Sequence, residues 1–114
     1  MTIARLRPLA EADLVERARY YSTEGGPDLG VRFFDAAVAS LRAIEKMPNA
    51  GSPRVGELCE IPGLRVRRIE GFPVGWFYFV RPDHADVVRL VSDAQELPSS
   101  WPISTPTDPP LNRS

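Results

Sequence analysis

Apolar residues in the first half of the chain recur with helical spacing. Residues 10–22 carry one such stripe: Ala10, Leu14, Ala18 and Tyr21. Residues 27–47 carry a second: Val31, Phe34, Val38, Leu41 and Ile44. Gly25, Gly26 and Pro27 separate the two stripes, and these residue types are typical of a helix end followed by a helix start. Because so short a connection forces two helices together, we predict an antiparallel helical hairpin.

Strand-like patterns lie on either side of this hairpin. Residues 2–8 alternate weakly between apolar and polar and end at a proline, which indicates a short strand. Three more strands are predicted over 64–69, 74–80 and 86–92. The middle one is apolar on both faces, so we expect it at the centre of its sheet. The order β-α-α-β-β-β predicts an α+β fold in which an N-terminal strand and a helical hairpin pack on an antiparallel sheet.

The end of the chain differs from the rest in its proline content. Five of the 12 prolines lie between positions 98 and 110, among serines and threonines. Such a segment suits neither helix nor sheet interior, so we expect a domain over 1–97 and a Pro/Ser-rich tail over 98–114. The N-terminus lacks the apolar stretch of an export signal, and no apolar run is long enough for a membrane span. These features predict a cytoplasmic protein.

Arginine is concentrated on the predicted strands. Residues 64–91 contain five of them: Arg65, Arg67, Arg68, Arg81 and Arg89. Only three acids share this segment, whereas the whole chain has a formal net charge of −1. Arginine binds carboxylates and phosphates through rigid paired hydrogen bonds. We interpret the five arginines as a partner-binding set, with an ordinary solvated sheet face as the alternative.

The remaining polar residues predict no metal site and no cofactor. Asp83, His84 and Asp86 are potential metal ligands, but they lie in a predicted tight turn, where aspartate is common for backbone reasons. The single cysteine, Cys59, excludes a disulfide framework, and Glu57 and Glu60 beside it disfavour its thiolate. The acids in the first half of the first helix, Glu11, Asp13 and Glu16, suit the positive end of the helix dipole.

Three segments resemble toxins of the ParE/RelE superfamily. The run "LRPLAEADLVERARYY" at 6–21 resembles the opening of ParE-type toxins, where a strand leads through a P-x-A-x-x-D-L pattern into a helix. The run "LRAIEKMPNAGSPRVGE" at 41–57 resembles the end of their second helix. Residues 63–97 resemble their three final strands, with a Tyr/Phe-rich strand in the middle. The resemblance covers about residues 3–97 and implies the RelE/ParE-like fold that the periodicity also predicts.

The resemblance implies a toxin of a bacterial type II toxin–antitoxin module, a class linked to plasmid stabilisation. RelE-like members cut messenger RNA on the ribosome, whereas ParE-like members poison DNA gyrase. Ser92 and Gln95 stand where family members often carry a histidine and an arginine, so a general acid or base for RNA cleavage is missing there. This favours gyrase inhibition with no catalytic residue. The implied partners are a ParD-like cognate antitoxin and DNA gyrase, without membrane contact or direct sequence-specific DNA binding by the chain alone.

Two alternatives stay open. A RelE-type ribosome-dependent endoribonuclease would use Arg65, Arg67, Arg81 or Arg89 to stabilise the pentavalent phosphate. A non-toxic relic would retain partner binding only. For a toxin, we expect a disordered antitoxin tail to fold on an exposed sheet edge and in an apolar groove beside the helices, with its acids on the arginines.

Overall fold

The predicted helical hairpin is present and is joined by a single residue. Helix α1 spans Pro8–Gly25 and helix α2 spans Pro27–Lys46. Gly26 between them has φ of 94°, a conformation that the absence of a Cβ allows. The computed structural model describes residues 2–92, so the expected tail at 98–114 and the last residues of the expected domain lie outside the described part.

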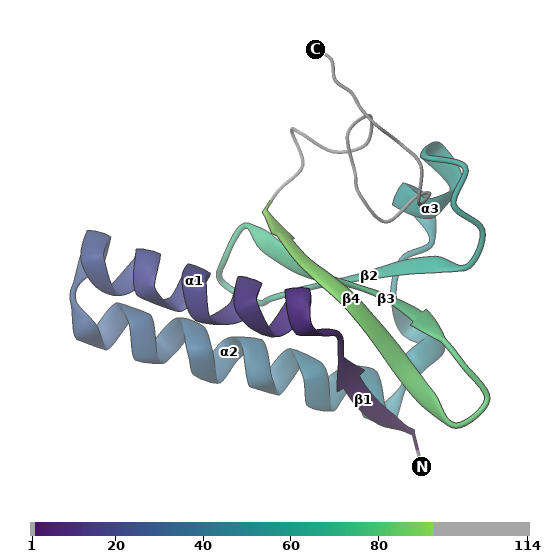
Figure 1. Ribbon diagram of the computed structural model, residues 1–114, viewed down its shortest axis with the longest axis horizontal. Helices are drawn as coiled ribbons and strands as arrows, with labels where there is room; N and C mark the ends of the chain where they lie inside the picture. The colour runs from purple at the N-terminus through teal and green to yellow at the C-terminus, as the bar shows by residue number, and fades with distance from the viewer. Residues whose placement is uncertain (1, 93–114) are drawn as a thin grey trace.

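Four strands form one sheet in the order β1-β4-β3-β2. Their bounds are β1 (Ile3–Leu6), β2 (Leu64–Arg68), β3 (Val74–Val80) and β4 (His84–Ser92). The three C-terminal strands are antiparallel, as predicted, and β3 lies between the other two. Strand β1 joins β4 in parallel, so the sheet as a whole is mixed. The hairpin crosses one face of the sheet, and its connecting end projects past the strands (Figure 1).

Two short helices connect the hairpin to the sheet, and the sequence patterns did not predict them. The 3₁₀ turn η1 spans Pro48–Ala50, and α3 spans Arg54–Leu58. Both are too short to show a helical period, which explains why the pattern missed them. In the described part of the chain, no helix is long and apolar enough to cross a membrane.

Apolar side chains fill both faces of the sheet. The larger cluster lies between the strands and the hairpin and includes Trp76 and Tyr78, which are fully buried. The Trp76 indole N–H donates to the carbonyl of Ala37 at 3.0 Å, and the Tyr78 hydroxyl donates to that of Pro48 at 2.6 Å. The smaller cluster lies on the other face and contains Ile61, Leu64, Phe77 and Val88. Strand β3 is therefore buried on both sides.

The predicted apolar stripe of α2 is wrong by one residue at its start, whereas Leu41 packs against the core and Ile44 is buried as expected. The side chains of Val31 and Phe34 are 60% and 44% exposed. The buried positions are Gly30, Phe33, Ala37, Ser40 and Ile44. The predicted and the buried positions both follow helical spacing, and at the start of α2 they differ by one residue, as Phe34 and Phe33 do. Small residues decide between them: a Cβ at Gly30 would overlap the Ser22 side chain, so the close approach of α1 and α2 at this point requires glycine.

Candidate functional site

Arg65 and Arg67 lie together on the face of β2 that the helices cover. Their register partners on β3 are Tyr78 and Trp76. The Arg65 Nη1 donates to the carbonyls of Asn49 at 3.0 Å and Gly51 at 2.7 Å. Arg65 thus holds the segment after α2 against the sheet.

The Tyr78 hydroxyl lies beside this pair of arginines. Burial raises the pKa of Tyr78, while a backbone hydrogen bond at Gly51 and the charges of Arg65 and Arg67 oppose the rise. A Cβ at Gly51 would overlap the hydroxyl, so this close approach requires glycine.

Of the remaining predicted arginines, Arg68 is exposed at the end of β2.

Arg89 is bound by an aspartate of the first helix. Its Nε and Nη2 donate to Asp13 Oδ2 and Oδ1 at 2.7 and 3.0 Å. The backbone N–H of Leu90 donates to the same Asp13 Oδ2 at 3.0 Å. Hydrogen bonding to Asp13 raises the pKa of Arg89 against the opposing effect of burial. Asp13 is therefore more than a helix-dipole residue: it fixes α1 to β4 just beyond the end of β1.

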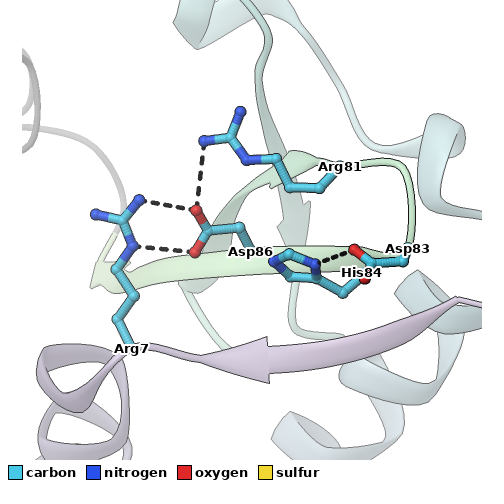
Figure 2. Close-up of polar contacts among 5 residues, drawn as sticks. All are labelled: Arg7, Arg81, Asp83, His84 and Asp86. Atoms are coloured by element: carbon cyan, nitrogen blue, oxygen red, sulfur yellow. Dashed lines mark hydrogen bonds and ion pairs between the residues drawn. The ribbon is translucent and has the colours of Figure 1, made fainter.

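Arg81 belongs to a third arrangement, which the sequence did not reveal. The carboxylate of Asp86 accepts hydrogen bonds from Arg7 Nε at 3.0 Å and from Arg7 Nη2 at 2.8 Å. Arg81 Nη2 approaches the same carboxylate at 3.4 Å (Figure 2). The hydrogen bond from Arg7 is the main cause that lowers the pKa of Asp86. Arg7 is far from this segment in sequence, and only the pairing of β1 with β4 brings it close.

The five predicted arginines therefore do not form one patch. Arg65 lies with Arg67 near the end of α2, whereas Arg89 contacts α1. Arg81 contacts Asp86 near the turn between β3 and β4. Two further residues complete these arrangements: Arg7, which the sequence patterns did not single out, and Asp13, which they assigned only to the helix dipole.

The turn acids and the cysteine do not form a metal site. Within residues 2–92, no group of three His, Cys, Asp or Glu side chains is placed to hold a metal ion. Asp83 contacts His84 Nδ1 at 2.7 Å, which lowers the pKa of Asp83. The carboxylate of Asp86 forms ion pairs with arginine side chains. Burial raises the pKa of the Cys59 thiol, so burial adds to the expected suppression of its thiolate.

Other parts of the chain form hydrogen bonds with backbone groups on the outer edges of the sheet. On the outer side of β2, Val66 exchanges two hydrogen bonds of 2.9 Å with Ser52. On the outer side of β1, the Ala4 N–H donates to Glu45 of α2 at 2.9 Å. The expectation of an exposed sheet edge is therefore wrong at these positions. The physical reason is that an unpaired edge invites foreign strands, and side chains or short bridges that fill it prevent this.

An apolar groove of about 430 Å³ lies between the two long helices. Six residues line it: Ala18, Arg19, Ser22, Gly30, Val31 and Phe34. Val31 and Phe34 are the residues whose predicted burial proved wrong, and they form part of its wall. Arg19 is the one charged residue in this lining.

Known proteins share this fold. A family model described as "ParE toxin of type II toxin-antitoxin system, parDE" matches residues 4–97. Among solved structures, one titled as the chromosomal ParDE toxin–antitoxin system from P. aeruginosa matches with a TM-score of 0.70 and 22% sequence identity. The match covers 81% of this chain and 96% of that chain. A comparison with curated proteins finds no match. The structural likeness shows a common fold, and the family match agrees with the resemblance noted in the sequence.

Proposed function

We propose that this chain, which belongs to the ParE toxin family of type II toxin–antitoxin systems, inhibits DNA gyrase and is neutralised by a cognate antitoxin. The family match over residues 4–97 is the observation that carries the proposal. A gyrase target implies action in the cytoplasm.

The contacts of Arg65 and Arg89 support action by binding rather than by RNA cleavage. Arg65 gives its Nη1 to two backbone carbonyls, and Arg89 gives two nitrogens to Asp13. Groups committed to the fold in this way are poorly placed to stabilise a pentavalent phosphate, which needs donors aimed at the developing charge. Ser92 ends strand β4 where a nuclease of this superfamily would often carry histidine. The second expected position, Gln95, lies outside the described residues.

The groove between α1 and α2 is the surface best suited to the antitoxin. An amphipathic helix binds such a groove by placing apolar side chains at helical spacing into it. Val31 and Phe34 offer exposed apolar surface at the groove, and Arg19 offers one positive charge for an acid of the antitoxin. The occupied backbone positions on β1 and β2 also favour the groove over strand addition.

A gyrase assay tests the proposed target. The purified chain is expected to block supercoiling of relaxed plasmid by gyrase, and its induction is expected to trigger DNA-damage signalling. Codon-positioned cleavage of messenger RNA with supercoiling unaffected would establish the RelE-type activity instead.

A pair of variants tests the proposed antitoxin surface. Val31→Glu places a charge in the groove, and because Val31 is 60% exposed the fold should tolerate it. We expect this variant to lose co-purification with the antitoxin encoded beside it. Leu58→Glu on α3 is the matched control, since Leu58 is also exposed but lies outside the groove lining. Equal retention of antitoxin by both variants would exclude the groove.

A further inference from the structure

Asp86 holds two guanidinium groups against a single carboxylate. Arg7 makes two hydrogen bonds to it, at 3.0 and 2.8 Å, and Arg81 makes a longer one at 3.4 Å. Figure 2 shows the two arginines converging on the carboxylate from different parts of the chain. Because one negative charge serves two positive charges, the three residues together carry an excess of one positive charge. Asp86 stays ionised at neutral pH, since hydrogen bonding to Arg7 lowers its pKa, so this excess persists.

Both guanidinium groups keep donors that face solvent. The side chains of Arg7 and Arg81 are 48% and 44% exposed, whereas Asp86 is 15% exposed. A guanidinium has five N–H donors. Arg7 presents two of its nitrogens to Asp86, and Arg81 presents one at the longer distance. A second oxyanion can therefore approach from the solvent side without displacing Asp86.

The two arginines are also held in place before any ligand arrives. The backbone N–H of Arg7 donates to the carbonyl of Val87 at 2.9 Å, and the backbone N–H of Arg81 donates to the carbonyl of His84 at 2.8 Å. The Arg81 guanidinium carbon lies 5.0 Å from the centroid of the Phe79 ring, in a cation–π contact. Fixed backbones and a stacked side chain reduce the entropy lost when a ligand binds.

The surrounding charges favour a carboxylate over a nucleic acid. Arg5 is the register partner of Asp86 and adds a positive charge nearby, while Asp83, in a hydrogen bond with His84, adds a negative one. Asp83 and Asp86 thus lie among these three arginines, and the whole chain has a net charge of −1. Nucleic-acid binding normally requires several phosphate contacts and a larger basic excess. A single excess charge in a fork geometry matches one carboxylate.

We propose that Arg7 and Arg81, held together by Asp86, form a binding site for a carboxylate side chain from an acidic segment of a protein partner. The identity of that partner as antitoxin or gyrase rests on the proposed function, but the site itself does not. Arg7 thereby joins the predicted Arg81 as a partner-binding residue, at a place separate from the apolar groove between α1 and α2.

An NMR titration of the full chain, carrying isotope-labelled arginine, tests the site. The probe is the peptide acetyl-Glu-Gly-Glu-amide, and its control is acetyl-Gln-Gly-Gln-amide. We expect the Nε–H signals of Arg7 and Arg81 to shift in a saturable manner with the acidic peptide only, and the shifts to disappear at high salt. The Nε–H signal of Arg42, which is exposed on α2, is the internal reference and should move much less.

A variant and a competing ligand make the test decisive. Arg81→Gln should weaken peptide binding by about fivefold, which is the upper range for one exposed ion pair. Arg42→Gln should leave the affinity unchanged. Equal shifts at all exposed arginines would overturn the proposal, and so would tighter binding of a short single-stranded RNA at Arg7 and Arg81. The outcome does not depend on gyrase inhibition, so failure of this site and failure of the proposed function are distinguishable.

Discussion

Two aspartates bind arginines at strand β4, Asp13 from helix α1 and Asp86 from the strand itself, and they do so with different results. Asp13 accepts two hydrogen bonds from Arg89 and one from the Leu90 N–H. Asp86 accepts two from Arg7 and a longer one from Arg81. The side chains of the first pair are 24% and 18% exposed, whereas both arginines around Asp86 are nearly half exposed.

The difference separates an arginine used by the fold from arginines available to a partner. Around Asp13 the charges are balanced one to one, and the carboxylate also satisfies a backbone donor of β4. Around Asp86 two cations share one anion, so charge and donors remain toward solvent. Removing one partner of a partly buried pair leaves a charge that water compensates only in part, while an exposed pair is screened by water. Four predictions test this contrast.

The largest effect is expected for Asp13→Ala. The substitution leaves the Arg89 charge and the Leu90 N–H without their acceptor, so we expect a loss of about 2 kcal/mol in the free energy of unfolding. Urea denaturation followed by circular dichroism measures it. Glu16→Ala, an exposed acid on the same helix, is the control and should change stability by less than about 0.5 kcal/mol. Similar losses for both variants would remove the distinction.

Double-mutant cycles compare the two sites directly. The cycle of Asp13→Asn with Arg89→Met should give a coupling energy of about 1.5 kcal/mol, because Arg89 is less exposed than Arg7 although both arginines bind their aspartate through two nitrogens. The cycle of Asp86→Asn with Arg7→Met should give less than about 1 kcal/mol. Unfolding curves of the single and double variants supply both values. A larger coupling at Asp86 would reverse our assignment of roles.

The dependence of stability on pH should reveal Asp86. Its pKa is lower in the folded chain than in the unfolded chain, so its contribution is fully present above the unfolded value, about 3.9. That contribution is lost as the pH falls through the lower folded value. Asp86→Asn should therefore flatten the acid limb of stability against pH, below about pH 4. Unchanged acid denaturation in this variant would contradict the ion-pair arrangement.

The smallest effect is expected for Arg81→Gln. This arginine makes one long contact to Asp86 and is 44% exposed, so stability should change by less than about 0.5 kcal/mol. Thermal denaturation would detect a larger loss. The variant should nevertheless weaken binding of the acidic peptide, and that combination of unchanged stability and reduced binding is what marks a partner-binding residue.

The order of the two long helices and the four strands could be predicted from the sequence because each depends on local spacing. The apolar period of the hairpin, Gly26 between its helices and the apolar strand 74–80 all appear in the structure. The burial of Trp76 and Tyr78 on one face follows from the two-residue period of a strand. The resemblance to ParE-type toxins rests on the same local patterns and is confirmed by the family match.

Only the tertiary structure decided which side chains meet. The α2 stripe was ambiguous between Phe33 and Phe34, and the close packing of Gly30 against Ser22 selected Phe33. Asp13 and Arg89 are 76 positions apart, and Arg7 and Asp86 are 79 apart. Local spacing carries no information about such pairs, because one arises from the parallel pairing of β1 with β4 and the other from the packing of α1 against β4. The sequence by itself determined the long helices, the strands and the family, whereas the tertiary structure determined which arginines are bound within the fold and which stay nearly half exposed.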